Sequence, residues 1–198
     1  MRLRPFAVSI AAVAAMAAPC ASAASDDEIW KLLKDGGQVV LMRHTVTTPG
    51  VGDPPGMRVD DCSTQRNLTE QGQRHAKAIG QVVRAHGVAF DHVYSSPMCR
   101  CLDTAVLAFG HVDRAQASNN PNAGVEEPAR QVRDMRALVS ERRRGGNVIL
   151  VSHSSTIFAV TGINMNPGEM LVVTPQGDGN FQLRGKFLPA PEPRAEPE

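Results

Sequence analysis

Two residues suited to binding an anion, Arg43 and His44, stand directly after a short apolar run, residues 39–42. The run is short and rich in β-branched residues, and this pattern predicts a buried strand. In open α/β sheets, ligands bind at the carboxyl ends of the strands. A strand that ends in arginine and histidine therefore predicts a site for an anionic substrate.

Two later segments repeat this arrangement. Residues 147–151 form another apolar run, and His153 follows shortly after its end. Residues 91–97 predict a third strand, and Arg100 lies four residues past Ser96. If the three strands end at the same edge of one sheet, they bring two histidines and two arginines together.

These side chains suit phosphoryl transfer. The planar guanidinium of arginine binds pairs of phosphate oxygens, and a neutral imidazole can attack phosphorus and carry it covalently. A second, protonated histidine can stabilise the negative oxygens. A zinc site is the competing interpretation, but no third histidine, cysteine or carboxylate is evident nearby. We therefore expect no metal and no other cofactor.

Alternating helices and strands are predicted to position these residues. A first helix begins at the capping box of Ser25 and Glu28 and ends at Gly36. Further helices are expected at residues 68–86, 98–109, 125–144 and 154–161, and paired strands at residues 170–174 and 181–188. His75 and His86 are expected on the surface of their helix. The alternation predicts an α/β fold, a three-layer α/β/α sandwich with a mostly parallel sheet.

The segment after the first histidine, residues 47–61, is rich in proline and glycine and predicts a loop. Because it follows the proposed site directly, it can serve as a lid or specificity loop. An excursion over the surface without a function is the equal alternative.

Length and charge restrict the possible partners. The chain has 198 residues, which suits one domain with a full-sized core. Its formal net charge is +1, so the overall balance points neither to nucleic acid nor to an anionic membrane surface. We expect the partner to be a small phosphorylated substrate.

Residues 1–23 have the features of a signal peptide. Arginines precede an apolar, alanine-rich run, and Ala21-Ser22-Ala23 fits the small-x-small cleavage pattern. The run is shorter than the ~20 residues of a spanning helix, so we expect cleavage and no stable membrane span. Lipid attachment at Cys20 is the alternative. The mature protein is expected to be exported, to a bacterial periplasm.

Export makes disulfides permissible. Cys62, Cys99 and Cys101 remain after cleavage, so at most one intramolecular pair can form. Cys62 can pair with either of the other two, and three buried thiols are the alternative. We predict Cys62–Cys99, which would fix the loop after His44 to the helix that carries Arg100.

Several motifs together resemble the histidine phosphatase superfamily, in its phosphoglycerate mutase-like branch. They are Leu41-Met42-Arg43-His44, Asn67-Leu68-Thr69-Glu70-Gln71-Gly72, the segment from Ser95 to Ala105, and Val151-Ser152-His153. Residues 61–68 are similar to a segment of exported members. The resemblance implies a phosphoglycerate mutase-like domain, which we place at residues 25–188. The Pro- and Glu-rich tail, residues 189–198, is expected to be disordered.

The resemblance also implies a role for each site residue. His44 would be the nucleophile that becomes phosphohistidine, and Arg43 and Arg100 would hold the phosphoryl oxygens. His153 would stabilise these oxygens from the other side, and Arg66 would add a further contact.

Two departures from the family pattern affect the expected activity. Thr45 replaces the usual glycine after the first histidine, and the glutamate that acts as general acid in mutase-type members has no recognisable counterpart. Glu169 is our candidate acid, with Glu126 and Glu127 as alternatives. The missing motif argues against a mutase and predicts a phosphatase for a phosphate monoester, such as a phosphorylated envelope sugar or a phosphoprotein. A catalytically idle phosphate-binding or interaction protein is the alternative.

Overall fold

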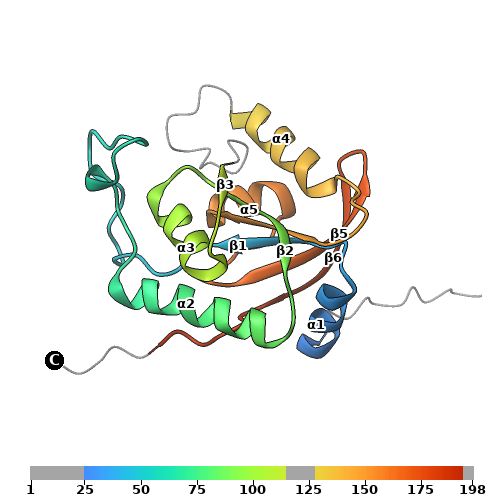
Figure 1. Ribbon diagram of the computed structural model, residues 1–198. Helices are drawn as coiled ribbons and strands as arrows, with labels where there is room; N and C mark the ends of the chain where they lie inside the picture. Colours follow the sequence, from blue (N-terminus) through green and yellow to red (C-terminus); the bar gives the residue numbers. More distant parts are fainter. Residues whose placement is uncertain (1–24, 115–127, 194–198) are drawn as a thin grey trace, which may run out of the picture.

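The computed structural model describes residues 25–114 and 128–193. The expected signal peptide, and also Glu126 and Glu127, lie outside this part of the chain. Within it, six strands form one sheet in the order β3-β2-β4-β1-β5-β6 (Figure 1). They are β1 (Val39–Arg43), β2 (Phe90–Ser95), β3 (Asp113–Arg114), β4 (Asn147–Ser152), β5 (Met170–Gly177) and β6 (Asn180–Phe187).

The sheet is parallel over four of its strands. β1 and β2 both run parallel to the central strand β4, and β3 runs parallel to β2. β5 is antiparallel to β1 and forms a hairpin with β6. The mostly parallel sheet expected from the sequence is therefore confirmed.

Helices cover both faces of the sheet. They are α1 (Asp26–Asp35), α2 (Glu70–Ala85), α3 (Cys99–Phe109), α4 (Pro128–Ser140) and α5 (Ser154–Thr161), with a short 3-10 helix, η1 (Cys62–Thr64). The expected capping box is present at the start of α1, where the Ser25 side chain accepts a hydrogen bond from the Glu28 amide. Figure 1 shows α2 and α4 on opposite sides of the sheet.

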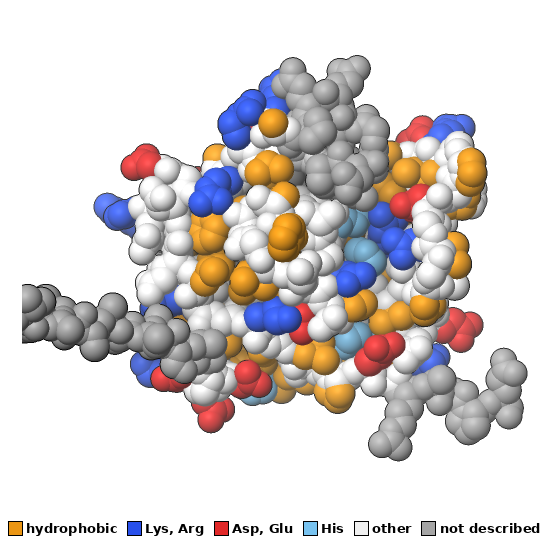
Figure 2. Space-filling view, turned by 180° about the vertical axis from the view of Figure 1, so that it is seen from behind, with side chains coloured by type: hydrophobic (Ala, Val, Ile, Leu, Met, Phe, Trp, Pro, Cys, Tyr) orange, Lys and Arg blue, Asp and Glu red, His pale blue; other side chains and the backbone are white. Residues whose placement is uncertain are grey.

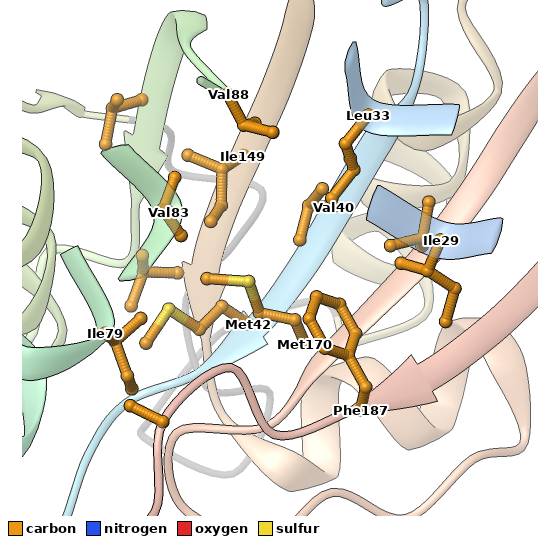
Figure 3. Close-up of a cluster of buried hydrophobic side chains, with 14 of the residues drawn as sticks. Ile29, Leu33, Val40, Met42, Ile79, Val83, Val88, Ile149, Met170 and Phe187 are labelled. Atoms are coloured by element: carbon orange, nitrogen blue, oxygen red, sulfur yellow. The ribbon is translucent and has the colours of Figure 1, made fainter. Parts of the chain in front are cut away.

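Alternating strand residues build the two halves of the core. Val40 and Met42 of β1 point to the cluster that α1, α2 and α3 cover, which Figure 3 shows in close-up. Val39 and Leu41 point to the opposite cluster, which α4 and α5 cover. Because β1 is buried on both faces, its sequence is a continuous apolar run. The three-layer sandwich is therefore confirmed.

Three details differ from the expectations. Helix α4 ends at Ser140, four residues before the expected end at Arg144. His75 is not a surface residue, because it is buried and its Nε2 lies 2.9 Å from the carbonyl oxygen of Ala190. His86 is half-buried and stacks on Trp30 at 4.0 Å between ring centroids.

The contact with His75 also extends the folded part beyond residue 188. Ala190 is buried, and the carbonyl oxygen of Pro193 accepts a hydrogen bond from the Gln71 side chain. Disorder was expected from residue 189 onward. Ala190 and Pro193 instead contact residues of α2, so the ordered part of the chain extends to residue 193. Within the described ranges, no helix combines the length and the apolar character needed to cross a membrane.

Candidate active site

Three strand ends meet at one edge of the sheet. Arg43 at the end of β1 lies opposite Ser152 of β4, and Ser95 at the end of β2 lies opposite Val151. The His44 amide donates to the carbonyl oxygen of Ser152 at 3.0 Å, so the strand pairing holds the backbone of the first histidine in place. Figure 2 shows histidine atoms between Lys or Arg atoms on one face, with an acidic side chain beside them.

The His44 ring is held in one tautomer. Its Nδ1 lies 2.7 Å from the carbonyl oxygen of Thr45. Only a protonated Nδ1 can donate to a carbonyl oxygen, so Nε2 carries a free lone pair while the ring is neutral. Nε2 of His44 is therefore the ring atom with a lone pair available for nucleophilic attack, as the predicted role requires.

The surroundings keep the His44 ring neutral. Burial lowers its pKa to about 3; the hydrogen bond to Thr45 opposes this, and the charges of Arg100, Arg43 and Arg66 lower the pKa further. A protonated imidazole cannot attack phosphorus. The lowered pKa therefore keeps the His44 ring in its neutral form well into the acidic range.

His153 lies next to the nucleophile. The two ring centroids are 5.5 Å apart, and the ring planes meet at 69°. Ser96 places its hydroxyl oxygen 2.9 Å from Nε2 of His153. Burial lowers the pKa of His153 well below its ordinary value, and the neighbouring His44 and arginines lower it further. The surrounding protein groups thus favour the neutral form of His153. The protonated form expected from the sequence would need the negative charge of a bound phosphoryl group nearby.

Three arginines surround the histidines. Arg43 donates from Nη1 to the carbonyl oxygen of Met165 at 2.7 Å, and Arg66 donates from Nη1 to the hydroxyl of Thr47. Arg100 is 1% exposed and donates from Nη1 to Oδ1 of Asp53 at 2.8 Å. The Nε atoms of all three arginines are buried without a hydrogen-bond partner. These donors are therefore available to the oxygens of an anion.

The loop after β1 contributes to the site. Oδ1 of Asp53 accepts from Arg100 and also from the backbone amide of Arg66 at 3.2 Å. Through Asp53, the loop at residues 47–61 contacts two of the expected site residues, and its role as a lid or specificity loop stays a prediction. Asp53 was not found from the sequence, because an aspartate in a Pro- and Gly-rich loop carries no motif.

The predicted disulfide holds this loop against α3. Cys62 and Cys99 are bonded, with a Cα–Cα distance of 5.7 Å, as predicted. Gln65 accepts from the Cys99 amide at 2.9 Å and donates to the carbonyl oxygens of Arg58 and Val59. Cys101 is a buried free thiol whose sulfur lies 3.6 Å from Nε2 of His153, and burial raises its pKa to about 12.

Thr45 has a structural reason to replace glycine. Its hydroxyl donates to the carbonyl oxygen of Gly72 at 2.8 Å, and its amide donates to the hydroxyl of Thr104 at 3.2 Å. Among the described non-glycine residues, only Asp178 has a positive φ, so the backbone at Thr45 does not require glycine. The substitution therefore keeps the turn and links β1 to α2 and α3.

Glu169 does not fit the proton donor expected from the sequence. Its carboxylate accepts from the Asn166 amide at 2.6 Å and pairs with Lys186 at 3.0 Å. Burial raises its pKa, but the hydrogen bonds from Asn166 and Lys186 outweigh burial and hold the pKa below its ordinary value. Glu169 is thus an ionised partner of Lys186 rather than a carboxylic acid.

The structure therefore brings together five residues expected in the site: Arg43, His44, Arg66, Arg100 and His153. It adds Asp53 and Ser96. Ser96 lies inside the motif from Ser95 to Ala105, but the sequence assigned no role to it. Among the described residues, no group of three His, Cys, Asp or Glu side chains is arranged to hold a metal ion.

Part of the sequence matches the profile of a known family. The profile described as "Histidine phosphatase superfamily (branch 1)" matches residues 39–120, which contain His44, Arg66 and Arg100. A search of curated proteins found no significant match.

Solved phosphatase structures share the fold. A phosphoserine phosphatase from Entamoeba histolytica, in complex with 3-phosphoglyceric acid, has 17% identity and a TM-score of 0.56, over 75% of this chain and 95% of that chain. A putative alpha-ribazole-5'-P phosphatase from Escherichia coli has 18% identity and a TM-score of 0.55, over 76% and 95%. The protein histidine phosphatase SixA, complexed with tungstate, has 16% identity and a TM-score of 0.54, over 77% and 97%. At these identities the likeness shows the fold.

Proposed function

We propose that this chain is a member of the histidine phosphatase superfamily, whose profile matches residues 39–120, and that it is a phosphatase that hydrolyses a phosphate monoester through a phosphohistidine on His44. The observation that carries the proposal is the free Nε2 of His44 among three arginines with unpartnered Nε donors. Without the arginine donors, His44 would have no groups beside it to hold the phosphoryl oxygens. Without His44, the arginine donors would only bind phosphate. The combination suits covalent phosphoryl transfer.

The reaction has two displacements. Nε2 of His44 attacks phosphorus, the bond from phosphorus to the ester oxygen breaks, and the leaving oxygen takes a proton to become an alcohol. Water then attacks the phosphohistidine and loses a proton, and Nε2 leaves with its lone pair restored. Arg43, Arg66 and Arg100 hold the phosphoryl oxygens in both steps, and His153 becomes the protonated partner of these oxygens once their charge is present.

The metal-independent reaction is part of the proposal. Three guanidinium groups supply the positive charge that a phosphoryl group needs, so the scheme requires no metal ion. The proposal names phosphate monoesters as the substrate class and no single compound. Phosphatases for different substrates share this fold, among them a phosphoserine phosphatase, a putative alpha-ribazole-5'-P phosphatase and a protein histidine phosphatase. With export through residues 1–23, a phosphorylated envelope sugar or a phosphoprotein would be accessible to the enzyme.

A phosphoryl-trapping experiment tests the proposal. The purified mature protein is mixed with phosphorus-labelled p-nitrophenyl phosphate and quenched within one turnover. We expect an acid-labile, alkali-stable label on the wild type, no label and no turnover in His44→Ala, and an unchanged label in His111→Ala, which removes an exposed histidine. Turnover should persist in EDTA.

Other results would contradict parts of the proposal. Full activity in His44→Ala would exclude a phosphohistidine at this residue. Loss of activity in EDTA, with recovery on adding zinc, would restore the metal interpretation. Tight phosphate binding without turnover of any monoester would favour the idle phosphate-binding protein.

A further inference from the structure

The proposed reaction needs a proton donor that Glu169 does not provide. Cleavage of an alkyl phosphate expels an alkoxide, which leaves slowly unless it is protonated as the bond breaks. We propose that Asp53 is the general acid that protonates the leaving oxygen, an inference that rests on the proposed function. Both carboxylates form ion pairs, but Asp53 pairs with Arg100 of the site, whereas Glu169 pairs with Lys186, which is not among the site residues.

Asp53 is the carboxylate in contact with the arginine cluster. Of the described carboxylates, it is the one that hydrogen-bonds to these arginines, through Arg100 Nη1 at 2.8 Å and the Arg66 amide at 3.2 Å. A phosphoryl group bound by Arg100 would therefore lie next to Asp53. This proximity is the first requirement for a proton donor.

Asp53 is more accessible to solvent than the histidine and the arginine it would assist. His44 is 3% exposed and Arg100 is 1% exposed, whereas the side chain of Asp53 is 20% exposed. In an in-line displacement, the leaving group lies on the far side of phosphorus from the nucleophile. Asp53 is more exposed than His44 and Arg100, and the proposal places the leaving oxygen on the Asp53 side of phosphorus.

The substrate itself can supply the proton that Asp53 passes to the leaving oxygen. The charged groups that face Asp53 are the guanidinium of Arg100 and Arg66 with its amide, and the thiol of Cys101 is buried close by. A phosphate monoester that binds as its monoanion carries one proton of its own to this position, next to the Asp53 carboxylate. The proton that binds with the substrate can therefore reside on Asp53.

The proton is then returned within the cycle. Asp53 gives its proton to the leaving oxygen while the ester bond breaks, and its carboxylate can accept the proton of the water that attacks the phosphohistidine. The loop that carries Asp53 is held by the Cys62–Cys99 disulfide and by the Gln65 hydrogen bond to Cys99. These links keep the carboxyl in position for both steps.

Asp53→Asn tests the assignment, because asparagine keeps an oxygen for Arg100 and Arg66 but has no acidic proton. The variant is assayed on p-nitrophenyl phosphate, on aryl phosphates with progressively poorer leaving groups, and on glycerol 2-phosphate. Asp60→Asn is the matched control: it lies in the same loop, and its ion pair with Arg58 is on the surface. Melting temperatures and the phosphohistidine label are measured for each variant.

We expect kcat/KM of Asp53→Asn to fall by about 100-fold or more on glycerol 2-phosphate and by less than about tenfold on p-nitrophenyl phosphate, with a steeper dependence on the leaving group across the series. The phosphohistidine label from p-nitrophenyl phosphate should persist. Asp60→Asn should match the wild type.

Equal losses on all substrates would overturn the assignment and make Asp53 a positioning partner of Arg100. An unchanged kcat/KM of Asp53→Asn on all substrates would also overturn the assignment. A steeper leaving-group dependence in Glu169→Gln instead of Asp53→Asn would do the same. Failure of the proposed function looks different, because the wild type itself would then show no label on His44.

Discussion

The hydroxyl oxygen of Ser96 lies 2.9 Å from Nε2 of His153, where β2 and β4 end side by side. The Ser96 amide donates to the carbonyl oxygen of Val151 at 2.9 Å, so the sheet fixes the position of this hydroxyl. A hydroxyl can donate to a neutral ring nitrogen and accept from a protonated one. Ser96 can therefore orient His153 in both protonation states.

Ser96→Ala should lower kcat by roughly 3- to 10-fold, since one net hydrogen bond contributes about 0.5–1.5 kcal/mol. The loss should appear in kcat rather than KM, because His153 acts on charge that develops during the reaction. Ser95→Ala is the control, since that buried hydroxyl donates to the Ser96 carbonyl oxygen instead of to His153. A larger loss in Ser95→Ala than in Ser96→Ala would contradict the role of Ser96.

Acidification should destabilise the protein through the two buried histidines. The folded-state pKa of His44 is about 3, below the ordinary value of 6.5, and that of His153 is also lowered. The unfolded chain therefore takes up protons first as the pH falls. The stability contributed by the neutral rings is complete above pH 6.5 and is lost as the pH falls toward 3.

The melting temperature between pH 7.5 and pH 4.5 measures this effect, which can reach about 1.4 kcal/mol per pH unit for each histidine. His44→Ala should lose less stability than the wild type over this interval, because it lacks one of the two groups. Parallel curves for the two proteins would show that His44 does not titrate differently in the folded state.

Loss of the disulfide should lower both stability and activity. Cys62 and Cys99 are separated by 37 positions, and closing a loop of this length stabilises the fold by ~3–4 kcal/mol in the chain-entropy model. The double variant Cys62→Ala/Cys99→Ala should show this loss in chemical denaturation, together with weaker activity because the loop of Asp53 is released. Non-reducing peptide mapping should find the Cys62–Cys99 peptide and a free Cys101. Three free thiols in the mature protein would contradict the pairing.

Gly72→Ala should be destabilising although it lies in a helix, where alanine normally stabilises. A Cβ at Gly72 would lie 2.1 Å from the carbonyl oxygen of Val46, two residues after His44. We expect a loss of about 1–3 kcal/mol, as in other overpacked sites, and reduced activity because the chain after His44 must move. Gln73→Ala, on the exposed side of α2, is the control. A neutral result for Gly72→Ala would mean that α2 can move away at little cost.

Much of the fold could be predicted because its signals are local. The apolar runs of β1 and β4 show which segments are buried, and the residues that follow each run are fixed at the strand end by the chain itself. Parallel strands end at a common edge, so Arg43, His44 and His153 had to meet once the strands were neighbours. The capping box of α1 and the Cys62–Cys99 pair were also predicted correctly.

What the sequence alone determined is the set of residues at the strand ends and the chemistry that these residues can perform. The tertiary structure decided which carboxylate joins them: Asp53 reaches Arg100 across 47 positions, while Glu169 is bound by Lys186 across 17. It also decided the tautomer of His44 and the neutral state of both histidines, through burial and the nearby arginines. The physical reason is that hydrogen-bond partners, burial and electrostatic fields depend on distances in space, and no local pattern of residues specifies which loop folds over a given strand end.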